Sequence, residues 1–244
     1  MRKLFGILLF LFPAILRADP PILTDDPDSP KQNGWEIFAG AVVEKRDRVL
    51  LMETPSVEIE YGVLDSLQIT FQQAWITRAS EHQGTQNGIG DSLAGVKWRF
   101  LDQDTSGVSV SVYPQFSFND SNRSVNLGLV TKGWQMILPV EVQRKFGGTI
   151  LMSEFGYTWR EQSSNGLLYG LAVEQEINEK FSLLAELHGE SAIRFLEGVL
   201  VFDLGFRWQT SEHVALIGSA GRALYEGSRS APDFIGYLGL QFAY

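Results

Sequence analysis

The 244-residue chain contains no cysteine. Disulfide frameworks and thiolate metal sites are therefore excluded, and so is lipoprotein processing, which acylates a cysteine. Histidine is also scarce, and no pair among His82, His188 and His213 has the spacing of metal ligands on a helix. We therefore expect neither a metal site nor a cofactor.

Basic residues are in the minority. The chain has 20 Lys and Arg against 29 Asp and Glu, for a formal net charge of −9. Nucleic acids require a basic surface to neutralise their phosphates, so we do not expect one as a partner.

Long apolar runs are confined to the start of the chain. Arg2 and Lys3 precede the apolar stretch 4–12, and Ala18 follows at a position suited to cleavage. This order predicts a signal peptide over residues 1–18, because the stretch is short for a membrane-spanning helix. A retained anchor helix is the alternative. No later segment is apolar for 18 residues, so a membrane form of this protein would have to be a closed barrel, which leaves no sheet edge in lipid.

Residues 19–33, DPPILTDDPDSPKQN, are rich in Pro and Asp and predict an extended periplasmic lead-in. From Gly34 onward the dominant period is two, which indicates strands with one apolar and one polar face. We therefore predict an all-β fold over residues 34–244, a transmembrane antiparallel up-and-down β-barrel of about 12 strands, with 10 to 14 possible. The expected strands are 34–44, 54–63, 67–77, 90–100, 107–118, 131–142, 149–159, 166–177, 181–192, 198–208, 214–222 and 233–244.

The predicted connections alternate between short turns and longer loops, as in bacterial barrels. The longer ones are 45–53, 78–89, 119–130, 160–165, 193–197 and 223–232. This order places both termini in the periplasm. The apolar run 49–52 in the first long loop either extends the first hairpin or folds inward.

Aromatic residues cluster near the predicted strand ends, where an interfacial girdle would lie. The girdle comprises Trp35, Trp75, Trp98, Trp134, Trp159, Trp208 and Tyr244. A soluble β-sandwich, the alternative, would gather its tryptophans in one core or groove.

The last strand alternates Leu238, Leu240, Phe242 and Tyr244 on one face, and the chain stops on an aromatic residue. This ending resembles the signal that the barrel assembly machinery reads. We therefore expect that machinery and outer-membrane lipid as partners.

Charged residues recur on the polar face of the strands and predict a wet or internally paired lumen, because charges are costly against lipid. The predicted lumen residues are Glu36, Glu58, Glu60, Asp91, Lys97, Arg99, Glu141, Glu154, Glu174, Glu176, Glu186, His188, Glu190, Asp203 and Arg207. Acids outnumber bases, which favours cations or neutral solutes over anions. In the alternative, these charges pair and close the lumen.

His188 lies between Glu186 and Glu190, with Ser191 nearby, and this grouping raises the hypothesis of a lipid hydrolase. A regular strand, however, turns Ser191 to the opposite face from His188. We therefore favour a hydrogen-bond network in the lumen and expect no enzyme.

Several stretches resemble a family of bacterial outer-membrane proteins catalogued as transporters or under a MetA pathway of phenol degradation. They are PPILTDDP at 20–27, GWE at 34–36, VEIEYGV at 57–63 with LQI at 67–69, and GIGD at 88–91 leading to GVKWRF at 95–100, the most specific. The resemblance implies a porin-like barrel in the outer membrane of a Gram-negative bacterium, moving small molecules, and it implies no catalytic residues.

The predicted function is thus a passive channel or transporter for small solutes with an acid-rich lumen. Two alternatives remain open: a structural or adhesive barrel that acts through its outer loops, and a lipid-modifying barrel enzyme.

Overall fold

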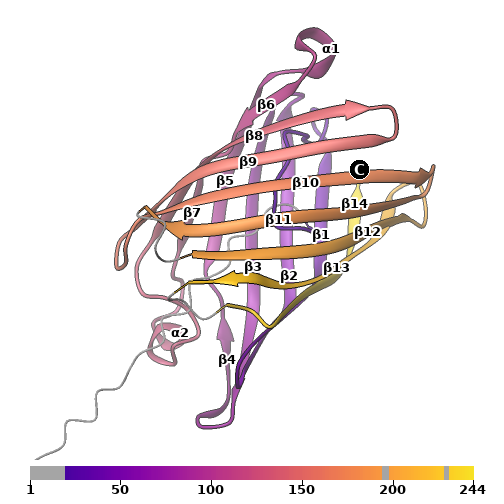
Figure 1. Cartoon of the computed structure of the whole chain (residues 1–244). Coiled ribbons are helices and arrows are strands. Elements are labelled where there is room, and N and C mark those ends of the chain that lie inside the picture. Colours follow the sequence, from indigo (N-terminus) through magenta and orange to yellow (C-terminus); the bar gives the residue numbers. More distant parts are fainter. Residues whose placement is uncertain (1–19, 194–197, 228–230) are drawn as a thin grey trace, which may run out of the picture.

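The computed structural model describes residues 20–193, 198–227 and 231–244. The predicted signal peptide at 1–18 lies outside these residues, as do parts of the predicted loops 193–197 and 223–232. The described chain forms a closed antiparallel barrel of 12 strands (Figure 1). This confirms the predicted fold class and strand number.

Two of the 12 wall strands are interrupted, so the barrel contains 14 labelled segments. They are β1 Trp35–Arg46, β2 Val49–Leu64, β3 Leu67–Ser80, β4 Gly84–Ile89, β5 Ser92–Leu101, β6 Ser109–Val112, β7 Gln115–Phe118, β8 Gln135–Phe146, β9 Thr149–Arg160, β10 Gly166–Asn178, β11 Phe181–Ala192, β12 Gly198–Gln209, β13 Val214–Glu226 and β14 Phe234–Ala243. β4 and β5 form one wall strand broken at residues 90–91, and β6 and β7 form another broken at residues 113–114. Pro114 contributes to the second break because it has no N–H for the ladder.

The barrel closes where the first strand meets the last. β1 pairs with β14 in continuous register from Glu36↔Ala243 to Lys45↔Phe234. The remaining wall strands pair with their sequence neighbours, which gives an up-and-down topology without crossover connections.

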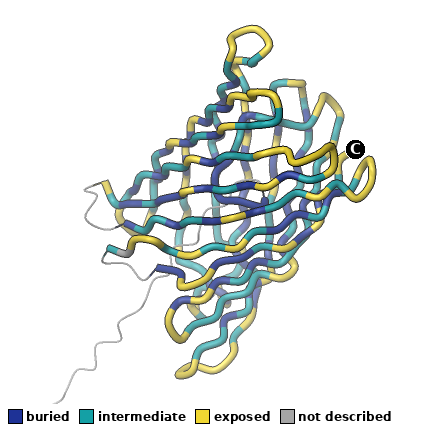
Figure 2. Tube along the Cα trace, turned by 45° about the vertical axis from the view of Figure 1, so that its right-hand side comes forward, coloured by how far each residue is buried: buried dark blue, intermediate teal, exposed yellow. Residues whose placement is uncertain are grey.

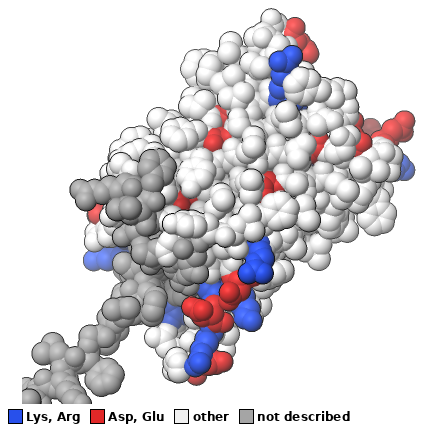
Figure 3. Space-filling view, in the orientation of Figure 1, with Lys and Arg blue, Asp and Glu red and all other residues white. Residues whose placement is uncertain are grey.

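Burial alternates along the strands (Figure 2), as expected when one face meets lipid and the other the lumen. On β9 and β10, Phe155 and Leu171 are 57% and 59% exposed, whereas their neighbours Glu154 and Ala172 are buried. Charged side chains are sparse over the middle of the face seen in Figure 3 and gather toward its ends.

Two predicted loops are largely strand. The 45–53 loop is reduced to a tight turn at residues 47–48, where Asp47 adopts a positive φ of 47°. The apolar run 49–52 extends the first hairpin, since it pairs with β1 on one side and β3 on the other. Likewise β3 and β4 continue through most of 78–89. In both places the hairpin continues as paired strands beyond the predicted membrane-spanning length.

Two short helices, α1 Gln103–Ser106 and α2 Asn122–Asn126, lie in connections. Within the described residues, no helix combines the length and apolar composition needed to cross a membrane.

Candidate functional site: the barrel lumen

The lumen is occupied by the chain itself. Residues 20–28, here called the inner segment, were expected to form a periplasmic lead-in, but they lie inside the barrel, and residues 20–25 are buried. An aperiodic Pro/Asp stretch gives no sequence signal for such a position. Its buried backbone groups must find hydrogen-bond partners on the barrel wall.

Carboxylates of the wall supply partners for the inner segment's backbone. The two carboxylate oxygens of Glu186 accept hydrogen bonds from the N–H groups of Leu23 and Thr24 at 2.7 and 2.8 Å. Glu154 accepts from the N–H of Asp25 at 3.3 Å. A buried backbone N–H without an acceptor would be costly, so these two acids hold the segment in place.

A buried ion pair fixes the middle of the inner segment. Lys97 Nζ lies 2.8 Å from Asp25 Oδ1, and both side chains are fully buried. The same ammonium lies 4.9 Å from the ring centroid of Tyr113, within cation–π range. Removing one partner of such a pair leaves an uncompensated buried charge, which costs about 3–5 kcal/mol.

Asp28 anchors the end of the inner segment. Its carboxylate lies 2.8 Å from Lys145 Nζ and 3.5 Å from Arg99 Nη1, and it accepts a hydrogen bond from Gln143 at 3.1 Å. Burial raises the pKa of Asp28, but the hydrogen bond and charge of Lys145, with Gln143 and Arg99, outweigh it and lower the pKa below its usual value.

The lumen is not uniformly polar, contrary to expectation. Ile22 packs against Met152, Ala172 and Leu184 of the wall. In a second cluster, Leu23 packs against Val201 and Ile235. The sequence pattern marks inward positions by their charged residues, and it gives no sign of an apolar partner inside the barrel, so these inward apolar residues cannot be recognised from it.

Two wall glycines leave room for residues near the start of the chain. A Cβ at Gly170 would overlap the side chain of Thr24, and one at Gly62 would overlap the backbone of Pro30 and Lys31. Each glycine therefore allows a close approach that a larger residue would block.

The predicted lumen residues differ in their burial. Buried are Glu58, Glu60, Lys97, Glu141, Glu154, Glu186, His188 and Asp203. Partly buried are Glu36, Asp91, Arg99, Glu174, Glu190 and Arg207. Glu176 is exposed near the end of β10, which sets it apart from the others.

The predicted girdle residues are mostly exposed. Trp35, Trp75, Trp98, Trp134 and Trp208 are 41–52% exposed and Tyr244 is 68% exposed. Trp159 is partly buried, with its ring 4.6 Å from that of Tyr157. Trp75 lies farther from a strand end than expected, because β3 continues to Ser80.

The geometry around His188 supplies no activated nucleophile. Neither of its ring nitrogens has a hydrogen-bond partner among the described residues, and the same holds for Ser191 Oγ. A hydrolase would need these side chains joined by a hydrogen bond. Glu190 instead pairs with Arg160 at 3.1 Å.

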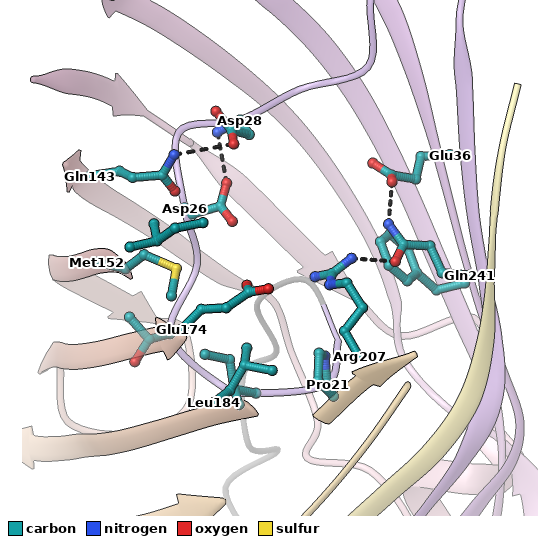
Figure 4. A pocket seen from close by; sticks show the side chains of 14 residues that line it. Pro21, Asp26, Asp28, Glu36, Gln143, Met152, Glu174, Leu184, Arg207 and Gln241 are labelled. Atoms are coloured by element: carbon teal, nitrogen blue, oxygen red, sulfur yellow. Dashed lines mark hydrogen bonds between the residues drawn. The ribbon is translucent and has the colours of Figure 1, made fainter. Parts of the chain in front are cut away.

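A cavity of about 200 Å³ lies between the inner segment and the wall (Figure 4). Its wall residues come from the strand ends near the short turns and the C-terminus. Glu36, Glu174 and Arg207 were predicted to face the lumen, whereas Phe38, Gln143, Ile150, Met152, Leu184 and Gln241 were not singled out. For all of these except Gln241, whose strand contains no charged residue, the even spacing from an inward charge on the same strand was the available signal.

Solved structures of outer-membrane channels share this fold. The COG4313 outer membrane channel from Pseudomonas putida F1 superposes with a TM-score of 0.74 at 12% identity, covering 92% of this chain and all of that one. The NanC porin gives 0.60 at 10% identity, over 85% and 98% of the two chains. The CymD monoaromatic hydrocarbon channel gives 0.51 at 8% identity, over 88% and 89%. Among curated proteins none matches this chain.

The family model described as "Putative MetA-pathway of phenol degradation" matches residues 24–240. The match runs from inside the inner segment to the closing strand and so covers the lumen-forming chain. It agrees with the resemblance in the motifs at 20–27, 34–36, 57–63 and 88–100. The chain therefore belongs to the family described as putative MetA-pathway of phenol degradation proteins.

Proposed function

We propose that the protein is a passive outer-membrane channel for small solutes, with its termini and short turns on the periplasmic side. The observation that carries this proposal is the contrast between the two faces of the wall. Charged side chains such as Glu141 and Lys97 are buried inside, while apolar side chains such as Leu171 are exposed outside. The channel folds of the structural neighbours support it.

Carboxylates predominate over basic groups on the inner wall, which favours the passage of cations over anions. The inner segment narrows the path, because residues 20–25 are buried within the lumen. We therefore propose small conductance steps and a preference for cations.

Planar-bilayer recording of the purified, folded protein tests the proposal. We expect discrete conductance steps in potassium chloride and, across a salt gradient, a reversal potential of the sign that cation preference gives. Folding is verified first by the shift in gel mobility on heating. A silent bilayer with folded protein would contradict the channel and favour adhesion through the outer loops; anion preference would contradict the role of the acidic wall.

A further inference from the structure

The cavity beside the inner segment has an apolar side. Phe38, Ile150, Met152 and Leu184 line it from β1, β9 and β11, and Ile22 of the inner segment contributes a further apolar side chain. Burying apolar surface of a solute against these residues is favourable, at about 25 cal/mol per Å². The cavity is therefore suited to a molecule with a compact apolar body.

The rest of the cavity lining is charged, and most of its charges are negative. Asp26, Asp28, Glu36 and Glu174 line it together with a single basic residue, Arg207. Asp28 is offset by Lys145 and Arg99, as described above. The charge of Lys145 also acts on Asp26 and Glu174. The four carboxylates still outnumber the three basic groups Arg99, Lys145 and Arg207, so the cavity has a net negative charge.

The carboxylates of Glu36 and Glu174 differ in how they are held. Gln241 accepts a hydrogen bond from Arg207 and donates one to Glu36, which links that guanidinium to a carboxylate (Figure 4). Glu174, in contrast, extends toward the cavity, and its carboxylate makes neither a hydrogen bond nor an ion pair within 4 Å among the described residues, although the charge of Lys145 acts on it from farther away. A carboxylate in this state is the natural partner for a positively charged ligand group.

We propose that this cavity binds small organic cations whose ammonium group lies at Glu174 and whose apolar body packs on Met152 and Leu184. The assignment rests on the proposed channel function and defines its solute class. An anion would be opposed by the net negative charge, and a fully apolar solute would leave Glu174 desolvated without a partner. A volume of about 200 Å³ restricts the ligand to roughly one ring, since pockets for drug-sized molecules start near 300 Å³.

Isothermal titration calorimetry on the full, detergent-solubilised barrel tests this with three probes of similar shape: benzylammonium, benzyl alcohol and benzoate. We expect benzylammonium to bind most tightly and benzoate least. Glu174→Gln should weaken benzylammonium binding about fivefold, as loss of one partly exposed charge pair does, and leave benzyl alcohol unaffected. Glu176→Gln, the same change two residues along β10 and outside the cavity lining, is the matched control.

A second variant tests the apolar side. Ile150→Phe should fill part of the cavity and weaken benzylammonium and benzyl alcohol alike, with folding checked by gel mobility. Equal binding of all three probes, or an effect of Glu176→Gln equal to that of Glu174→Gln, would overturn the charge assignment. Absence of benzylammonium binding would overturn the site itself. Conductance of the same preparation is recorded separately in planar bilayers. Loss of ligand binding with conductance retained would overturn the binding site alone, and absence of conductance would overturn the channel function.

Discussion

His188 is a buried imidazole, 3% exposed, whose ring nitrogens both lack partners among the described residues. Replacing it with Leu removes two desolvated polar atoms and breaks no hydrogen bond. We expect His188→Leu to leave the free energy of unfolding unchanged or to raise it by up to about 1–3 kcal/mol. Urea unfolding of the folded barrel in detergent measures this.

Glu186→Leu provides the contrast, at the next inward position of β11. It removes the acceptor of the Leu23 and Thr24 N–H groups and should lower the free energy of unfolding. A loss as large for His188→Leu as for Glu186→Leu would show that His188 has a structural partner.

Asp28 makes the stability of the folded barrel depend on pH. Its pKa is lower when folded than when unfolded, so its stabilising contribution is complete above the unfolded value near 3.8 and is lost as pH falls through the folded value. Asp28→Asn should therefore lower the melting temperature at pH 7 and have no effect at the lowest pH at which the barrel stays folded. The effect should stay below about 1 kcal/mol, because the Asp28 and Lys145 side chains are nearly half exposed. A difference that persists undiminished in acid would contradict this account.

At the scale of elements, the inner segment and β10 are matched in shape at Gly170. Gly170→Val should place a branched side chain where Thr24 now lies, at a cost of about 1–3 kcal/mol for overpacking. Displacing residues 20–28 from the lumen relieves that clash, so we expect a larger single-channel conductance.

Deletion of residues 20–28 supplies the control for Gly170→Val. The deletion alone should raise conductance, and adding Gly170→Val to it should raise it no further, because the two changes act through one contact. Additive increases would mean that Gly170 affects the path independently of the inner segment.

The strands could be predicted from sequence because a membrane barrel imposes period two on every one of them, as at residues 57–63. The inner segment could not. Ile22 and Leu23 are two apolar residues in an aperiodic stretch, and their partners, such as Met152 and Val201, are separated from them by more than a hundred residues. Gly170, a glycine on an inward position, was the local sign that something approaches the wall closely.

At the scale of the whole molecule, the barrel is closed by β14, which pairs with β13 on one side and with β1 on the other. The backbone of Tyr244 completes the β1 ladder through two hydrogen bonds of 2.9 Å with Trp35. Its side chain, in contrast, is 68% exposed and stacks only on His213, 5.3 Å between ring centroids, among the described residues. The aromatic ring therefore adds little to the stability of the finished barrel.

This separation of backbone and side chain yields a prediction about assembly. Tyr244→Ala should reduce the amount of folded barrel in the outer membrane, because we propose that the assembly machinery reads the aromatic side chain that directly follows β14. The free energy of unfolding of refolded protein should change by no more than about 0.5 kcal/mol, as for other exposed positions. Phe234→Ala, on the same strand at its other end and 43% exposed, should leave membrane yield unchanged. Equal membrane yields for the two variants would show that Tyr244 is not part of the recognition signal. A large loss of stability for Tyr244→Ala would show that its ring stabilises the closed barrel instead.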